Sequence, residues 1–345
     1  MGSFTSNAII SKAKNIYGNR LKKADYEYMV SLKSVSEVES YLKTKHYYKD
    51  SLKDVQSAFI HRGQLEEIIR KVIFSHSLKL VHFIKTKDYS FYTLNMVQRE
   101  IDIVLSVLRA IISGEYDAML ANYPSHFKKH ASFDLDKLTI SKTYDDLLLS
   151  LKNTRYYDVL QPFYEKETEL IKYVAIEQSL DILFYDVVFQ RIAENYKRKH
   201  REDLETIYST KIELNNIVKI YRLKKFYKAD KETILESLIL KYSRISSKKL
   251  EEIISIDDAD LILQYLEKSE YSKYMDEKEY IYVEYYAERM KYNLAKRYMY
   301  FSNDAPEVYS AFIILMEIER DNLFNIIEGI RYELEEEEIK RMLIY

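Results

Sequence analysis

Apolar residues along this chain recur mainly at three- and four-residue spacing, which is the spacing of one face of an α-helix. The longest such stretches are expected to be helices, and they cover Leu65–Ile84, Leu94–Leu108, Leu170–Val187, a segment ending near Tyr227, Tyr282–Leu294 and Ile313–Ile330. Shorter helices are expected over Ser6–Tyr17 and Lys23–Ser31. Only 5 Gly and 3 Pro occur in 345 residues, so a fold with many tight turns is disfavoured. The pattern predicts an all-α protein.

One short pattern occurs three times, and each copy is called a signature. The copies are Ser34–Tyr48, Thr143–Tyr157 and Asp258–Ser272. Thr143 follows Ser34 by 109 residues, and Asp258 follows Thr143 by 115. Apolar or aromatic residues align without a gap at four positions, Val35/Tyr144/Ala259, Val38/Leu147/Ile262, Leu42/Leu151/Leu266 and Tyr47/Tyr156/Tyr271. The recurrence indicates an internal repeat, whose units bury their apolar faces against one another.

Each signature opens with a residue type that starts helices. Ser34 and Glu37 form the capping-box spacing, and Thr143 with Asp146 stands at the same position in the second copy. Asp258 is a good N-cap in the third copy. We therefore expect each signature to begin a helix.

The repeat divides the chain into three predicted domains. They are helical repeat 1 with the N-terminal helix at 1–125, helical repeat 2 at 126–237 and helical repeat 3 at 238–345. Gly114 and Pro124 support the first boundary, because glycine interrupts the helical pattern and the residue before a proline is pushed away from helical geometry.

The helix that closes each predicted repeat carries an arginine after its apolar stripe. When the three closing helices are aligned, Arg109, Arg222 and Arg331 occupy one position. These arginines could interact with the helix dipole or form salt bridges. Alternatively, three equivalent arginines could form a ring that faces a partner, which makes them the candidate interface residues.

Composition narrows the class of protein. The formal net charge is −2, so no whole-chain field attracts nucleic acid or an anionic membrane. The chain has no Cys, which excludes a disulfide framework, thiol catalysis and thiolate metal sites. No uninterrupted apolar run approaches the length of a membrane span, and a soluble intracellular protein is expected.

Catalytic and cofactor-binding motifs are not found. With 5 Gly and no glycine-rich phosphate loop, ATP hydrolysis by this chain alone is not expected. His126 and His130 have the spacing of a metal pair, but the lysines between them would repel a cation. Asp145 and Asp146 are explained most simply as helix-capping carboxylates. The basic run Lys197–Arg201 could touch nucleic acid or lipid head groups, but a solvated helix end is favoured. No cofactor, metal or catalytic residue is predicted.

The stretch IYGNRLKKADYEYMVSLKSVSEVESYLKTKHYY, the threefold repetition and the arginine pattern of the closing helices resemble the C subunit of archaeal and bacterial A/V-type ATPases. That family is homologous to the d subunit of the eukaryotic V-ATPase. The resemblance implies a funnel-shaped protein of three similar helical units around a pseudo-threefold axis, without catalytic residues. Ala110, Leu223 and Tyr332 follow the three arginines where the family commonly has more polar residues, which argues against an arginine ring facing the shaft.

The resemblance also implies a function. The family sits on the cytoplasmic face of the membrane, between the central-shaft subunits of D and F type and the proteolipid (c/K) ring, and transmits torque for ATP-driven H⁺ or Na⁺ transport. It implies membrane contact only through the ring, no nucleic acid, and a monomer when isolated. The alternative hypothesis is an α-solenoid scaffold that binds a protein along a concave surface. A weaker third hypothesis is an enzyme or nucleic-acid binder that uses the basic run.

Overall fold

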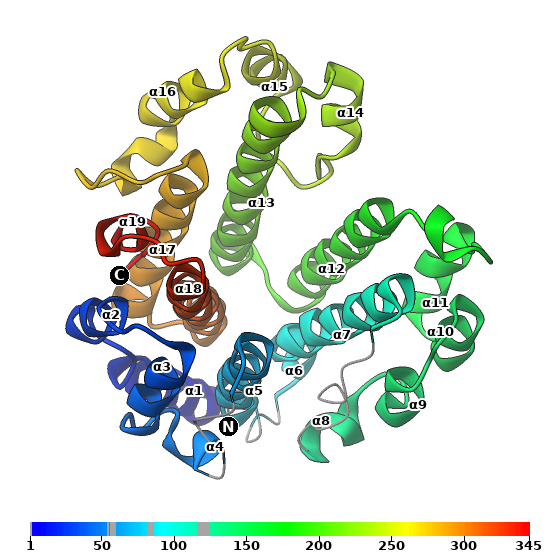
Figure 1. Ribbon diagram of the computed structural model, residues 1–345, viewed down its shortest axis with the longest axis horizontal. Helices are drawn as coiled ribbons and strands as arrows, with labels where there is room; N and C mark the ends of the chain where they lie inside the picture. Colours follow the sequence, from blue (N-terminus) through cyan, green and yellow to red (C-terminus); the bar gives the residue numbers. More distant parts are fainter. Residues whose placement is uncertain (1, 54, 56–59, 82–83, 85, 116–124) are drawn as a thin grey trace. The chain divides into compact units, whose positions relative to one another are not determined.

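The computed structural model describes residues 2–53, 55, 60–81, 84, 86–115 and 125–345. Within these ranges every regular element is a helix and none is a strand (Figure 1). The predicted all-α fold is confirmed. The chain divides into two compact units, unit 1 with Met1–Thr86 and Tyr196–Tyr345, and unit 2 with Lys87–Asn195.

Unit 1 is built from two separate segments of the chain. Its N-terminal segment contains α1 (Gly2–Gly18), α2 (Lys23–Val30), α3 (Val35–Lys43), α4 (Lys49–Leu52) and α5 (Arg62–Val81). Its second segment contains α13 (Arg198–Tyr227), α14 (Lys231–Glu236), α15 (Ser247–Ile254), η5 (Ala259–Leu261), α16 (Ile262–Lys268), η6 (Glu270–Tyr274), α17 (Val283–Phe301), α18 (Ala305–Arg331) and α19 (Glu336–Lys340), where η marks a 3₁₀ helix.

Helix α18 forms the centre of unit 1. It packs along α17 and also contacts α1, α5 and α13 (Figure 1). Eighteen of its 27 residues are buried, so this helix is covered on most sides and not along one stripe. Near its end, a Cβ at Gly329 would come within 2.6 Å of Ile339 Cγ1, so glycine allows α19 to pack closely here.

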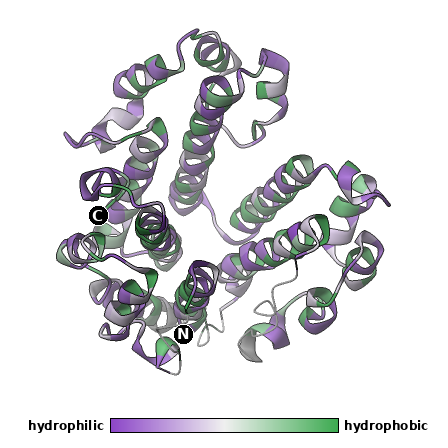
Figure 2. Ribbon diagram, in the orientation of Figure 1, coloured by the Kyte–Doolittle hydropathy of each residue, from purple (hydrophilic) through white to green (hydrophobic). Residues whose placement is uncertain are grey.

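Unit 2 contains α6 (Tyr89–Tyr92), α7 (Leu94–Ser113), α8 (Ser125–His130), α9 (Leu135–Thr139), α10 (Tyr144–Ser150), α11 (Arg155–Leu160), η3 (Gln161–Phe163), η4 (Thr168–Leu170) and α12 (Tyr173–Asn195). Helices α7 and α12 lie side by side, and the short helices α9 and α10 pack against α7 (Figure 1). Figure 2 shows hydrophobic and hydrophilic residues interspersed along these helices, as expected for helices with one buried face.

The predicted helix starts are confirmed. Ser34 Oγ accepts from the Glu37 backbone N–H at 3.2 Å, although the Glu37 carboxylate accepts from Lys33 N–H and not from Ser34. Thr143 and Asp146 make the full reciprocal capping box. Asp258 also caps, but it begins the 3₁₀ helix η5, which leads into α16.

The helix ends agree in part with the sequence pattern. Gly114 follows α7 with φ 72°, a left-handed conformation that glycine adopts without strain. Pro124, used for the first repeat boundary, lies outside the described residues. Helix α5 ends at Val81, before the predicted limit at Ile84.

Contacts group the chain differently from the predicted repeats. The signature helix α10 packs against α7, which closes the preceding predicted repeat. In the same way η5 packs against α13, and α3 packs against α18. Since a signature packs against the closing helix of another predicted repeat, compact units cut across repeat boundaries. The repeat boundaries at 125/126 and 237/238 are drawn from the recurrence of the signature in the sequence, and they stay predictions.

Candidate functional site

Three buried tyrosine–glutamate pairs attach the signatures to the long helices. In each pair, a tyrosine at the end of a signature donates its O–H to a glutamate within the apolar core. The pairs are Tyr48–Glu319, Tyr156–Glu100 and Tyr271–Glu213. Glu213 is fully buried, and Glu100 and Glu319 are each 3% exposed. A buried carboxyl group is destabilising unless it is hydrogen-bonded, so each tyrosine offsets part of this burial penalty.

The pair in α13 is reinforced by a salt bridge. Arg244 donates to Glu213 from Nε at 3.0 Å and from Nη2 at 2.8 Å, and its backbone N–H donates at 2.5 Å. Its Nη2 also donates to Thr210 Oγ1 at 2.8 Å. The hydrogen bond to Glu213 raises the pKa of the Arg244 guanidinium above its usual range. A two-pronged guanidinium–carboxylate contact is among the strongest side-chain interactions in proteins, so Arg244 gives the buried Glu213 a direct cationic partner.

The pair in α7 uses neutral donors. Glu100 accepts from Tyr156 Oη at 2.6 Å, and from the backbone N–H and hydroxyl of Ser132 at 2.6 and 2.7 Å. Burial, followed by the charge of Glu100, raises the pKa of Tyr156. The loop at Ser132 is thereby attached to the same carboxylate as the signature.

The pair in α18 has the fewest partners. Glu319 accepts from Tyr48 Oη at 2.8 Å, and no salt bridge reaches it within the described residues. Burial raises the pKa of Glu319 to about 7, although the Tyr48 hydrogen bond, the charge of Arg20, the backbone N–H of Leu21 and the charge of Lys22 act in the opposite direction. The carboxyl also lines a cavity of about 200 Å³, beside Arg20 and Lys22. Glu319 is therefore a buried carboxyl whose charge can change near neutral pH.

One predicted alignment is wrong by one residue. The sequence aligned Tyr47 with Tyr156 and Tyr271, but Tyr48 makes the bond to the glutamate. Tyr47 instead donates to Met316 Sδ at 2.9 Å and stacks on His76 at 3.7 Å between ring centroids. Two adjacent tyrosines satisfy the pattern equally, and only the turn after α3 decides which one faces the helix.

The buried glutamates also correct the alignment of the closing helices. Arg109 follows Glu100 by nine residues and Arg222 follows Glu213 by nine, whereas Arg331 follows Glu319 by twelve. The asparagine three residues after the glutamate supports this register in unit 1. Asn216 exchanges two hydrogen bonds with the backbone of Ile239, and Asn322 does the same with Ile344. Arg331 is therefore about one helical turn beyond the position of Arg222, because apolar stripes match equally well when shifted by a turn.

All three candidate arginines lie on the surface. Arg222, near the end of α13, pairs with Glu284 at 2.5 Å. Arg331 ends α18, with its guanidinium 5.4 Å from the ring centroid of Tyr332. Arg109 lies on α7 in unit 2, with Ser106 Oγ 3.4 Å away. A partner-binding role of these arginines stays a prediction.

Exposed aromatic side chains gather around one of these arginines. Phe226 and Tyr227 are 56% and 75% exposed at the end of α13. The Phe226 ring makes an edge-to-face contact with Tyr282 at 6.1 Å between centroids. We call Arg222, Phe226, Tyr227 and Tyr282 the aromatic end of α13. Exposed aromatic residues beside an arginine are the composition typical of protein-binding surfaces.

Residues 9–342 match the model of the family described as ATP synthase (C/AC39) subunit. The chain belongs to this family. It is also similar to the C subunit of the A-type ATP synthase of Methanosarcina mazei, with 25% identity over 126 residues, covering 35% of this chain and 33% of that protein. The chain thus matches about a third of the length of this curated relative. The resemblance stated from the sequence is confirmed, and the C/AC39 family match takes in all three signatures.

Other candidate sites in this C/AC39 family member have structural explanations. The basic run Lys197–Arg201 begins α13 as predicted, and Arg201 pairs with Glu205 at 2.7 Å. Asp146 caps α10, and hydrogen bonds from Thr143 and Lys142 lower its pKa. The side chain of His126 lies outside the described residues, so the histidine pair stays untested. Among the helices that the structure describes, none is both long and apolar enough to span a membrane.

Sequence reasoning missed the three buried glutamates. Each glutamate lies four residues before an apolar core residue of its helix, which is Val104, Ile217 or Leu323. Each glutamate is therefore on the buried side of its helix. A charged residue within an apolar stripe is the signal that could have identified them. The helices were predicted from the apolar residues of these stripes alone, and the glutamates within the stripes did not enter the prediction.

Proposed function

We propose that this chain is a non-catalytic rotor subunit of an A/V-type ATPase or ATP synthase. It joins the central-shaft subunits to the proteolipid ring, at the cytoplasmic face of the membrane, and transmits torque during ATP-driven H⁺ or Na⁺ transport. The family match over residues 9–342 carries this proposal. No separate observation favours the alternative function, an α-solenoid scaffold that binds a protein.

The buried pairs suit a part that carries mechanical load. Each signature is attached to a long helix by an interior hydrogen bond to a carboxylate, which is stronger than a neutral hydrogen bond. Breaking such a contact leaves a buried polar group without its partner. The pairs therefore resist sliding of the signatures along the long helices.

The order of the contacts supports the expected threefold organisation. Signatures two and three pack on the closing helices of predicted repeats one and two, and signature one packs on that of repeat three. We infer three similar helical units, in each of which one signature packs on the closing helix of another predicted repeat.

Co-purification tests the proposal. The full chain carrying an affinity tag is mixed separately with the shaft subunits and with the detergent-solubilised proteolipid ring. We expect it to bind both and to bridge them when all three are mixed. Failure to bind the shaft and the ring under conditions in which they assemble in the native complex would overturn the proposal.

The aromatic end of α13 is the surface we expect to meet a partner. The double variant Arg222→Ala/Phe226→Ala should weaken binding to the shaft or to the ring by at least about tenfold, the size expected for an interface hot spot. Lys248→Ala, an exposed residue of α15, is the matched control and should bind as the unaltered chain does. Arg109→Ala and Arg331→Ala test the ring of arginines, since equal losses in all three single variants would favour it.

A further inference from the structure

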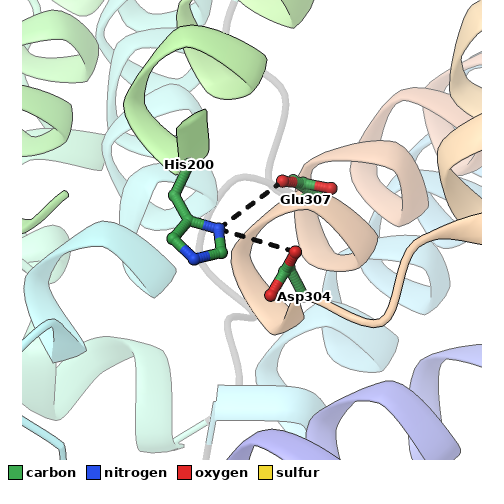
Figure 3. A group of neighbouring side chains, drawn as sticks. All are labelled: His200, Asp304 and Glu307. Carbon is green, nitrogen blue, oxygen red and sulfur yellow. Dashed lines mark ion pairs between the residues drawn. The ribbon is translucent and has the colours of Figure 1, made fainter. Parts of the chain in front are cut away.

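Three side chains of the types that can bind metal ions lie close together in unit 1, at the N-terminal ends of α13 and α18. His200 lies in the first turn of α13, Asp304 is the N-cap residue of α18, and Glu307 lies in the first turn of α18 (Figure 3). One ligand atom from each residue lies within 4.8 Å of the other two. Neither the basic-run hypothesis nor the proposed rotor function accounts for this cluster.

Glu307 is the residue that distinguishes this cluster from an ordinary surface ion pair. It is only 4% exposed, and its Oε2 accepts from Ser302 Oγ at 2.6 Å. Its Oε1 is buried without a hydrogen-bond partner. The same Oε1 faces His200 Nδ1 at 3.9 Å, which is too long for a hydrogen bond. A buried carboxylate oxygen is thus directed into the cluster without a hydrogen bond, and the His200 ring faces it at ion-pair distance.

Asp304 also points its carboxylate toward the histidine. An aspartate at an N-cap usually accepts a hydrogen bond from the first helical turn. Asp304 makes no such cap bond, and its Oδ2 lies 3.5 Å from His200 Nδ1. Its backbone N–H donates to Ser302 Oγ at 3.0 Å, so Ser302 hydrogen-bonds to both acidic residues.

The spacing of these atoms fits a small divalent ion. Nitrogen and oxygen ligands lie about 2.0–2.2 Å from zinc, so two ligands at a tetrahedral angle are about 3.4 Å apart. The observed separations of 3.5 and 3.9 Å from Nδ1 differ little from this value. His200 is exposed and Asp304 is partly exposed, so both can adjust while Glu307 stays fixed in the core.

We propose that His200, Asp304 and Glu307 bind one Zn²⁺ ion, with water in the remaining position. One imidazole nitrogen and two carboxylate oxygens form a ligand set that suits zinc, whereas Mg²⁺ and Ca²⁺ prefer oxygen ligands alone. Ser302 would orient Glu307 from the second coordination shell. The ion would join the N-terminal ends of α13 and α18.

Charges of both signs surround the cluster, because the basic residues Lys197, Arg198, Lys199 and Arg201 lie next to His200 in the chain. Asp304 and Asp203 place negative charge close to Glu307. His200 approaches Asp304 and Glu307 with one ring nitrogen, so it can compensate at most one of the two carboxylates. A divalent ion would neutralise two and would also give the unpartnered Oε1 a ligand bond.

Calorimetric titration of the metal-free full chain with Zn²⁺ tests this site directly. We expect one saturable site per chain, and a higher unfolding temperature with zinc that returns to the metal-free value when a chelator is added. A chain with no saturable zinc site would overturn the proposal and leave His200 as the centre of an ion pair.

Variants locate the bound metal. His200→Ala and Asp304→Asn change surface side chains, and each should weaken zinc binding by at least about tenfold. Ser302→Ala should weaken it about tenfold or more through the second shell. His46→Ala, an exposed histidine outside the cluster, is the matched control and should leave the affinity unchanged. Equal zinc affinity in His200→Ala and in the unaltered chain would show binding by other surface groups and would also overturn the proposal.

Discussion

The clusters around Glu213 and Glu319 place the same tyrosine–glutamate pair in two different electrostatic environments. Around Glu213, the guanidinium and backbone N–H of Arg244 and the hydroxyl of Tyr271 all donate to one carboxylate. Around Glu319, the side-chain donor is the hydroxyl of Tyr48, in the turn before α4. The local geometry recurs, but the compensation of charge does not.

This difference shows that a repeated structural contact can have different charge states in its copies. Glu213 has a direct cationic partner in Arg244. Glu319 lacks one within the described residues, and burial brings its pKa to about 7. The cluster on α18 should therefore respond to pH near neutrality.

Removing the cation around Glu213 should have the largest effect. Arg244→Ala leaves a fully buried carboxylate with fewer donors and without a counter-charge. Loss of one partner of a buried pair costs about 3–5 kcal/mol, and we expect about 2–4 kcal/mol here because the Arg244 side chain is 41% exposed. Chemical denaturation at pH 7 measures the loss. Arg222→Ala, which breaks an exposed ion pair with Glu284, is the control and should cost below about 1 kcal/mol.

The pH response of Glu319 should be the next largest effect. An acid whose pKa is raised in the folded state binds more protons there than when unfolded, so stability falls as pH rises from about 4.5 through about 7. Glu319→Gln removes this pH-dependent loss of stability. Relative to the unaltered chain, the variant should gain about 2–3 kcal/mol between pH 5 and pH 8.

Denaturation curves at several pH values check this response. Glu213→Gln is the matched comparison, because it removes the corresponding buried carboxylate of the cluster on α13. The idea fails if the stability difference between Glu319→Gln and the unaltered chain is constant with pH.

Removing the tyrosine hydroxyls should have a moderate effect that differs between the two clusters. Tyr48→Phe deletes the hydroxyl donor to Glu319, and loss of such a donor costs about 1–3 kcal/mol. The cost should be larger at pH 8 than at pH 6, because the hydroxyl stabilises the ionised carboxylate. Tyr271→Phe leaves the Arg244 donors in place and should cost about 1 kcal/mol at both pH values. Equal, pH-independent losses in the two variants would contradict the assigned charge states.

The asparagines that follow the glutamates should show the smallest difference between the two clusters. Asn216→Ala and Asn322→Ala each remove two hydrogen bonds to a buried backbone segment, at Ile239 and Ile344. We expect similar losses of about 1–2 kcal/mol for the two variants, independent of pH. Thermal unfolding of both variants measures this. A loss that depends on pH for Asn322→Ala alone would show that the asparagine is coupled to Glu319.

Local features of the fold could be predicted from the sequence. The caps at Ser34, Thr143 and Asp258 and the helix end at Gly114 depend on side chains and backbone angles within a few residues. The long helices followed from apolar spacing for the same reason. Leu170 and Val174 show the limit of that spacing, because they belong to a predicted apolar series but are 55% and 72% exposed.

The register between distant segments could not be predicted in the same way. Apolar stripes match equally well when shifted by one residue at Tyr47 and Tyr48, or by one turn at Arg331. The candidate arginines were found as surface residues, but Tyr282, which packs against Phe226 beside Arg222, comes from the distant segment that begins α17. The zinc cluster likewise joins His200 to residues about a hundred positions further along the chain.

The sequence by itself determined the all-α class, the places where helices begin, the family and the recurrence of the signature. These depend on local spacing and residue type, which a linear chain displays directly. Only the tertiary structure decided that Tyr48 faces Glu319, that Glu213 is paired with Arg244 while Glu319 is not, and that Glu307 points toward His200. The physical reason is that burial and charge pairing depend on which distant residues share a small volume, and helical periodicity is the same for many such arrangements.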